Sequence, residues 1–183
     1  MNEQEWEEHY RTTAQSAPQP PDTLLSDNRK LLTGGTALDI AMGSGRNAFF
    51  MAECGYRVIG VDRAESAACV VQSIARERRL TIDTVAADML EFDLGTERFD
   101  LIANFYFLER ELIPRIKQSL KPHGLVFFET FTSYQIPRDD PRYRKFLIDP
   151  NELLTMFSDF FIMYYFERIK GSKAIASMIA KKV

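Results

Sequence analysis

The sequence predicts an α/β fold in which a doubly wound, mostly parallel sheet of seven strands ends in an antiparallel β-hairpin. Three observations support this class. Residues 36–62 read as strand, glycine turn, helix and strand, the opening unit of such a sheet. Apolar runs then alternate with helical patterns as far as residue 130. Two final apolar runs, 160–169 and 174–180, are joined by Lys-Gly-Ser-Lys, which indicates a hairpin. The expected arrangement is Rossmann-like.

The elements follow one another without an internal break, so one domain is expected over residues 1–183. Residues 1–23 are interpreted as an N-terminal lid, formed by an acidic amphipathic helix over 2–15 and a proline-rich linker. Asp149 is expected to cap the last helix, and Lys121–Gly124 reads as a helix-terminating turn. Strands are expected at 37–42, 56–61, 80–86, 99–105 and 125–130, and helices at 47–54, 65–79, 109–120 and 149–159.

The glycine turn, Gly43-Ser44-Gly45, predicts a ligand site. Glycine lets the backbone approach a ligand closely, because a Cβ atom there would collide with it. The free N–H groups at the start of the following helix offer hydrogen-bond donors. Asp62 ends the second strand, where a carboxylate can accept hydrogen bonds from both hydroxyls of a ribose. This layout indicates a nucleotide-like cofactor.

Two kinds of cofactor fit the pattern. Residues 43–48 match the dinucleotide fingerprint, and Asp62 follows Gly43 by 19 positions, close to the usual spacing of about 20. A nicotinamide or flavin interpretation therefore stays open. Asp39 inside the first strand and Asp88 after the third strand argue against it, because a carboxylate beside a pyrophosphate would repel it. Acids at three successive strand ends suit a ligand with an amine, a ribose and an adenine amino group, which S-adenosylmethionine has.

The stretch from Asp39 to Gly45 resembles the first motif, D-x-[G/A]-x-G-x-G, of the class I S-adenosylmethionine-dependent methyltransferases, with Ala41 replacing the first glycine. Residues 45–67, 108–132 and 151–168 look like the tellurite-resistance and thiopurine methyltransferase-like branch. The resemblance implies S-adenosylmethionine as cofactor and S-adenosylhomocysteine as product. By resemblance, Asp88 accepts from the adenine amino group and Met89 packs on the ring. The implied cofactor-binding residues are Asp39, Ala41, Gly43, Gly45, Arg46, Asp62, Arg63, Asp88, Met89 and Asn104.

The acceptor side is expected at the carboxyl edge of the sheet. Glu129 ends the buried fifth strand, which is costly unless the carboxylate is paired, and Arg110 is its candidate partner. A substrate contact and an ordinary buried salt bridge are both open for Glu129. Residues 133–148, which two prolines interrupt, are interpreted as a substrate lid loop. The candidate substrate-binding residues are Tyr10, Tyr106, Arg110, Glu129, Tyr134 and Arg138.

Composition argues against several other classes. A net charge of −3 without a basic stripe gives no case for a nucleic-acid partner. Residues 104–107 also lack both prolines of the [N/D]-P-P-[Y/F] loop of amino-group DNA methyltransferases. Two histidines and two cysteines give no expectation of a metal site. Neither a leader-like apolar segment nor an apolar run of about 18 residues is present, so a cytoplasmic protein without a membrane partner is expected.

The expected function is methyl transfer from S-adenosylmethionine to a small-molecule acceptor, with thiols and selenium or tellurium oxyanions as the soft nucleophiles considered. Such acceptors need no dedicated base near neutral pH, so no catalytic residue is assigned. Two alternatives remain: a non-catalytic protein that binds S-adenosylmethionine or S-adenosylhomocysteine, and an NAD-binding protein. The sequence leaves both a monomer and a homodimer open.

Overall fold

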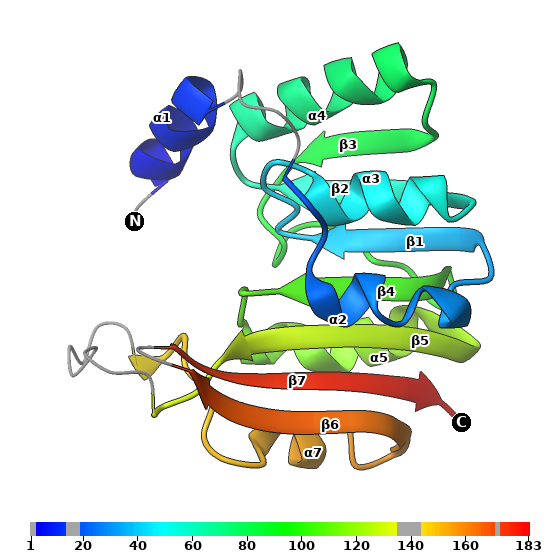
Figure 1. Ribbon diagram of the computed structural model, residues 1–183, viewed down its shortest axis with the longest axis vertical. Helices are drawn as coiled ribbons and strands as arrows, with labels where there is room; N and C mark the ends of the chain where they lie inside the picture. The colour runs from blue at the N-terminus through cyan, green and yellow to red at the C-terminus, as the bar shows by residue number, and fades with distance from the viewer. Residues whose placement is uncertain (1–2, 14–18, 135–143, 171–172) are drawn as a thin grey trace.

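The computed structural model describes residues 3–13, 19–134, 144–170 and 173–183. Their strands form one seven-stranded sheet with the order β3-β2-β1-β4-β5-β7-β6 (Figure 1). Strands β1 to β5 run parallel, whereas β7 runs antiparallel to both β5 and β6. The predicted fold class, including the C-terminal hairpin, is confirmed. The strands are β1 (Gly35–Ile40), β2 (Tyr56–Asp62), β3 (Ile82–Ala86), β4 (Phe99–Phe105), β5 (Leu120–Phe131), β6 (Phe160–Lys170) and β7 (Lys173–Lys182).

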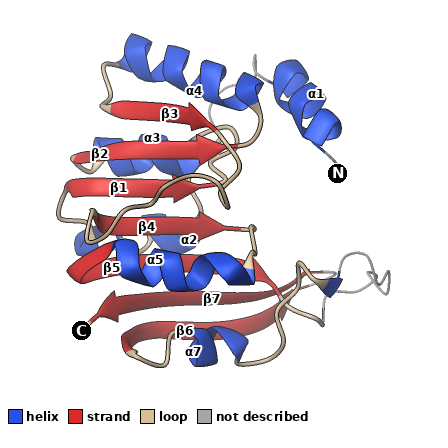
Figure 2. Ribbon diagram, turned by 180° about the vertical axis from the view of Figure 1, so that it is seen from behind, coloured by secondary structure: helices blue, strands red, loops and turns tan. Residues whose placement is uncertain are grey.

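Helices cover both faces of the sheet. One apolar core unites α2, α3 and α4 with one face, and a second unites α5 and α7 with the other (Figures 1 and 2). In both views α1 lies near the start of α4, beyond the carboxyl end of β3, and belongs to neither of these two layers. The helices are α1 (Glu3–Thr13), α2 (Thr23–Ser26), η1 (Arg29–Leu31), α3 (Arg46–Glu53), α4 (Glu65–Arg78), η2 (Arg110–Leu112), α5 (Ile113–Ser119) and α7 (Glu152–Met156).

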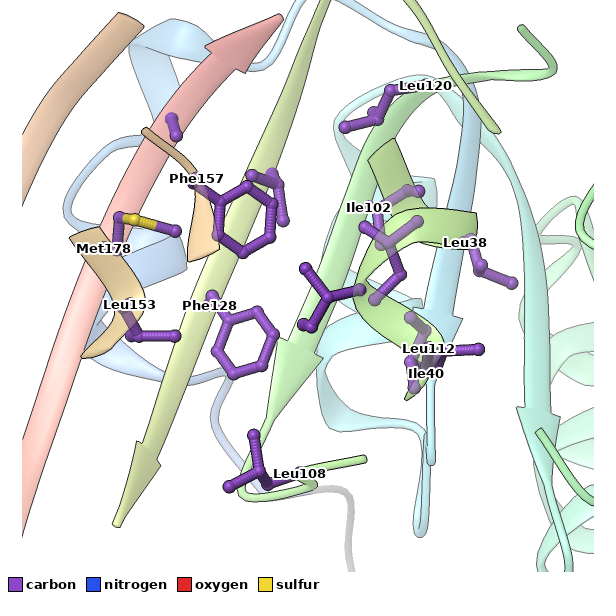
Figure 3. Close-up of a cluster of buried hydrophobic side chains, with 14 of the residues drawn as sticks. Leu38, Ile40, Ile102, Leu108, Leu112, Leu120, Phe128, Leu153, Phe157 and Met178 are labelled. Carbon is purple, nitrogen blue, oxygen red and sulfur yellow. The ribbon is translucent and has the colours of Figure 1, made fainter. Parts of the chain in front are cut away.

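The apolar core on the α5 and α7 face holds together the half of the sheet that contains β5 and β7. Figure 3 shows Leu153 and Phe157, from α7 and its end, packing toward Phe128 on β5 and Met178 on β7. The rings of Phe128 and Phe157 lie 6.1 Å apart, and both side chains are fully buried. Truncating a buried phenylalanine to alanine costs about 3–5 kcal/mol. Packing of this kind holds β5 and β7 in register, and these strands carry polar groups of the site.

Three local expectations differ from the structure. Helix α7 spans only Glu152–Met156, and its N-cap residue is Asn151 at φ 63°, not Asp149. Glu152 still accepts a hydrogen bond from the Asp149 N–H at 2.7 Å, so the expected contact between these two residues forms although Asp149 is not the N-cap. Residues 121–124 do not end a helix followed by a separate strand. They form an irregular start of β5, because Phe99 pairs with Leu120 and Leu101 already pairs with Leu125.

Candidate functional site

The glycine turn follows β1 at the carboxyl edge of the sheet. Ala41, Gly43 and Gly45 all have positive φ, at 52°, 53° and 77°, a region that L-residues with side chains rarely adopt. Gly45 is the N-cap residue of α3, and its N–H donates to the Met42 carbonyl at 2.9 Å. Ala41 therefore holds a strained backbone conformation at the position where the motif more often has glycine. Such strain is typical of backbone that is shaped around a ligand.

Asp62, at the end of β2, binds the glycine turn directly. Its Oδ2 atom accepts the Gly43 N–H at 2.8 Å, and its Oδ1 atom accepts the Ala64 N–H at 3.0 Å. Burial raises the pKa of Asp62, and these N–H donors oppose that rise. Each carboxylate oxygen keeps a second lone pair for a further donor. Asp62 is thus placed to accept hydrogen bonds from a ligand that lies beside the turn.

Asp39 on β1 is the most constrained acid of the site. The residue is 2% exposed, and its Oδ2 atom has no hydrogen-bond partner among the residues that the structure describes. Burial raises the pKa of Asp39 to about 8, the charges of Asp22 and Asp62 add to the rise, and the Ala48 N–H opposes it. A buried polar atom without a partner is destabilising, because desolvation is not compensated. The carboxyl group is therefore suited to a cationic or hydrogen-bond-donating ligand.

A buried polar cluster missed by the sequence analysis adjoins this acid. Asp22, from the proline-rich linker, exchanges two 2.9 Å hydrogen bonds with the Asn47 side chain, through its N–H and its Oδ2 atom. Its Oδ2 atom also pairs with Arg46 Nη2 at 2.8 Å. These contacts fasten the linker to the first turn of α3. A lone aspartate after two prolines gives no sequence signal of such a long-range contact.

Asp88 follows β3 and lies at the mouth of a hollow of about 420 Å³ lined by Arg63, Ala86, Ala87, Asp88 and Glu91. The Leu90 N–H donates to Asp88 Oδ1 at 2.9 Å, and Arg63 forms an ion pair with Oδ2. The Leu90 N–H and the Arg63 guanidinium hold the pKa of Asp88 below its usual range. Met89 does not line the hollow, because its side chain is buried in the core on the α5 face.

Helix α1 reaches from α4 to the glycine turn. The carboxylate of Glu7 accepts the Ser66 N–H, at 3.2 and 3.3 Å to its two oxygens, in the first turn of α4. At the other contact, a Cβ atom added to Gly43 would lie 2.7 Å from Tyr10 Oη. Burial raises the pKa of Tyr10 to about 12, the Asp62 charge adds to the rise and Arg46 opposes it. Tyr10 therefore lies directly over the turn, and Trp6 stacks on it with ring centroids 5.6 Å apart.

A second cluster of polar side chains crosses the half of the sheet that β4, β5 and β7 form. Tyr106, just after β4, donates its hydroxyl to Glu129 Oε1 at 2.6 Å, and Ser177 on β7 donates to Oε2 at 2.5 Å. The Arg46 guanidinium lies 5.9 Å from the centroid of the Tyr106 ring. Asn104 is buried and donates to the Phe107 carbonyl at 2.7 Å, holding the chain that follows β4. These contacts connect the glycine turn to the end of β5.

The expected pairing of Arg110 with Glu129 is wrong. The Arg110 guanidinium forms an ion pair with Glu152, with a shortest contact of 2.7 Å, and donates to the Lys145 and Leu147 carbonyls at 2.9 Å each. Arg110 therefore anchors the chain that leads into α7. The reason is topological: η2 faces α7, whereas the Glu129 carboxylate faces Tyr106 and Ser177.

The remaining acceptor-side candidates lie at the margin. Tyr134 is 55% exposed, and Arg138 lies outside the residues that the structure describes. Most of the proposed lid loop, 135–143, also lies outside them. Its two ends meet, because the Ile148 N–H donates to the Phe131 carbonyl at 3.0 Å and the Ser133 N–H donates to the Ile148 carbonyl at 2.7 Å. The loop thus leaves and rejoins the fold at the end of β5.

In residues 3–13, 19–134, 144–170 and 173–183, no three His, Cys, Asp or Glu side chains are grouped as they would be around a metal ion. No helix within the same ranges has the length and apolar character needed to cross a membrane. A further hollow of about 340 Å³ lies between β6, β7 and His123, and none of the acids described above lines it.

The strand order, the C-terminal antiparallel hairpin and the acids at three strand ends beside a glycine turn define the class of protein. The fold is that of the class I S-adenosylmethionine-dependent methyltransferases. Within that class, the chain belongs to the family of the tellurite resistance protein TehB, whose sequence profile matches residues 3–172. Family membership favours S-adenosylmethionine over a dinucleotide as the cofactor.

Individual relatives agree with this assignment. A Haemophilus influenzae protein named "Probable S-adenosyl-L-methionine-dependent methyltransferase TehB" is 27% identical over 149 residues, covering 78% of this chain and 52% of that protein. The ubiquinone biosynthesis O-methyltransferase of Coxiella burnetii is 31% identical over 104 residues, covering 54% and 44%. The crystal structure of TehB from Haemophilus influenzae superposes with a TM-score of 0.76 at 24% identity, covering 87% and 61%. The chain spans about half the length of the curated relatives it matches.

Proposed function

We propose that this chain transfers a methyl group from S-adenosylmethionine to a small-molecule acceptor. The observation that carries the proposal is Asp39, a buried carboxyl group with an unpartnered oxygen next to the glycine turn. An uncompensated buried carboxylate is costly, and a ligand ammonium group would supply the missing partner. The methionine end of S-adenosylmethionine carries such a group. A pyrophosphate would bring no such cation and would repel the ionised form of Asp39.

The geometry supports the following proposal for the remaining cofactor contacts. The positive-φ backbone of Ala41, Gly43 and Gly45 shapes the turn that would face the methionine end, and the absence of a Cβ atom on Gly43 lets Tyr10 close over it. Asp62 accepts the ribose hydroxyls through the lone pairs that Gly43 and Ala64 leave available. The hollow beside Asp88 and Arg63 receives the adenine ring. Arg46 and Asn104 hold the surrounding chain through their bonds to Asp22 and Phe107.

The chain itself has a positioning task. When bound, the sulfonium of S-adenosylmethionine supplies an activated methyl group, so the protein need not create a leaving group. The protein must hold the acceptor atom in line with the methyl carbon and keep water away. Helix α1 serves the second need, because Glu7 and Tyr10 bridge α4 and the turn. We propose that residues 1–23 and 133–148 act as lids on a single domain.

Several small acceptors remain in view. The family takes its name from tellurite resistance, and one relative is an O-methyltransferase of ubiquinone biosynthesis. Tellurium and selenium oxyanions, thiols and hydroxyl compounds therefore all belong in an acceptor screen. A finding of tight cofactor binding without methylation of any acceptor would favour a non-catalytic binding protein.

Calorimetry tests the cofactor assignment before any acceptor is known. We expect micromolar binding of S-adenosylmethionine and S-adenosylhomocysteine and none of NADH. The Asp62→Ala variant should bind S-adenosylmethionine at least about 2 kcal/mol more weakly, the scale of a lost pair of charge-assisted hydrogen bonds. Binding of NADH alone would overturn the assignment, and an unchanged affinity of D62A would remove the ribose role of Asp62.

A further inference from the structure

Tyr106, Glu129 and Ser177 form a row across β4, β5 and β7 at the carboxyl edge. Phe105 pairs with Glu129 and Glu129 pairs with Ser177, so neighbouring strands bring the three groups together. Both carboxylate oxygens of Glu129 accept a hydroxyl, from Tyr106 at 2.6 Å and from Ser177 at 2.5 Å. Glu129 is 3% exposed and Ser177 is 4% exposed, whereas Tyr106 is 39% exposed. Of these three residues, only Tyr106 reaches the surface of the site.

The phenol of Tyr106 is held in place from several sides. Tyr106 has φ 58°, the left-handed region that a bulky residue seldom adopts, and its N–H donates to the Glu129 carbonyl at 2.7 Å. Its ring packs against Phe131 with centroids 5.1 Å apart, and the Arg46 guanidinium lies over it. Strained backbone that is held by this many contacts is a mark of functional positions. The phenol therefore stands between the glycine turn and the end of β5.

The direction of the hydrogen bond determines what Tyr106 offers to a ligand. A phenol has a single proton, and Tyr106 donates it to Glu129. The phenol oxygen is then available as an acceptor for a donor group in the site. Burial, followed by the Glu129 hydrogen bond and charge, raises the pKa of Tyr106 above its usual range, so the side chain stays a neutral phenol. A neutral phenol between a donor and a carboxylate can pass a proton along without storing charge.

We propose that Tyr106 and Glu129 form a proton relay for a protic methyl acceptor, whose reacting atom is a hydroxyl oxygen, a thiol sulfur or an amine nitrogen. The inference rests on the proposed methyl transfer. Tyr106 Oη takes the acceptor proton while the Tyr106 proton moves to Glu129 Oε1. The acceptor lone pair forms the bond to the methyl carbon, and the electrons of the broken carbon–sulfur bond stay on sulfur. The sulfonium charge and the Glu129 charge are lost together, and Glu129 later returns its proton to solvent through Tyr106.

This relay distinguishes classes of acceptor. A preformed anion, such as a thiolate or an oxyanion, has no proton to lose and gains nothing from the relay. A neutral thiol or phenol is a poor nucleophile until its proton departs, and general-base assistance contributes about 100- to 10,000-fold. Tyr106 touches the acceptor and is the catalytic residue of the pair. Glu129 acts through Tyr106, so its test must separate a proton-transfer role from a structural one.

The test uses 2-mercaptoethanol and phenol as acceptors and measures S-adenosylhomocysteine formation from pH 6.5 to 10 in Y106F and E129Q. The matched control is Y164F, because Tyr164 on β6 has similar exposure, 42%, and lies outside the site. At pH 6.5 we expect the kcat of Y106F and of E129Q with 2-mercaptoethanol to lie at least about 100-fold below that of Y164F. The deficit should shrink to a few-fold at pH 10, because 2-mercaptoethanol, whose pKa lies about one unit above the 8.5 of cysteine, is then mostly ionised.

The outcomes separate the inference from the proposed function. S-adenosylmethionine affinity should stay within about 2-fold of Y164F in both variants, and the kcat deficit of E129Q should narrow with rising pH as that of Y106F does. A deficit that is equal at pH 6.5 and 10 would indicate a structural role and overturn the relay. Wild-type rates in Y106F would overturn it too, as would cofactor binding without turnover of either probe. If the unmodified protein did not bind S-adenosylmethionine, that result would instead overturn the proposed function.

Discussion

Cofactor binding should depend on pH in both directions, through Asp39 on the acidic side and through the ligand amine on the alkaline side. The contact requires an ionised Asp39 and a protonated ligand amine. The pKa of Asp39 is about 8, and an α-amino group also has a pKa of about 8. At pH 8 about a quarter of encounters have both groups in the correct state, whereas at pH 6 about 1 in 100 do. The dissociation constant of S-adenosylmethionine should therefore be about 25-fold higher at pH 6 than at pH 8, and should rise again toward pH 10.

Calorimetry over pH 6 to 10, with Asp39→Asn as the comparison, measures this dependence. The variant cannot ionise at this position, so its affinity should be weaker at pH 8 and nearly flat between pH 6 and 7.5. Its loss of affinity above pH 8 should remain, because that limb belongs to the ligand amine. A change of less than about 3-fold between pH 6 and 8 in the unmodified protein would refute the reasoning. So would an acidic limb of equal size in D39N.

Three further predictions concern the protein without ligand. Because the folded-state pKa of Asp39 is raised to about 8, the free energy of unfolding should fall as pH rises from about 4 to 8, by at most about 1.4 kcal/mol per pH unit. Urea unfolding of D39N should lack this part of the slope, and equal slopes in the two proteins would exclude the contribution of Asp39. Gly43→Ala places a methyl group 2.7 Å from Tyr10 Oη at positive φ, so the Tm should drop by an amount equivalent to about 1 kcal/mol or more, and an unchanged Tm would contradict the contact. Glu7→Gln removes the charge that accepts the Ser66 N–H at the start of α4, at a cost of about 0.3–1 kcal/mol; limited proteolysis should cut α1 faster, and an unaltered rate would show that this contact does not hold the helix.

The sequence predicts the fold well where the pattern is local. The unit over residues 36–62 contains its own signals, because a glycine turn between an apolar strand and a helix admits few other structures. The parallel order of the following strands then places Asp39, Asp62 and Asp88 at one edge without further information. The hairpin that ends the sheet is equally local, since a short polar turn joins its two strands.

The errors arise where partners are distant in the chain. Glu129 and Ser177 are 48 positions apart, and their contact follows only from the pairing of β5 with β7. Asp22 joins Asn47 across 25 positions, and a linker aspartate carries no sign of that partner. Arg110 looked available for Glu129 because both lie near strand ends, yet η2 turns its guanidinium toward Glu152. Sequence patterns identify which groups need a partner more readily than they identify the partner.

The position of β7 has a consequence for how the protein is made. Residues 173–182 leave the ribosome after β6, yet they insert between β5 and β6. During translation the outer edge of β5 therefore stays without its neighbour until residues 173–182 have emerged. An unpaired strand edge is prone to pair with other chains, so this interval is the most aggregation-prone of biosynthesis. Glu129 therefore gains its hydrogen bond from Ser177 only when β7 inserts, after β1 to β6 have emerged.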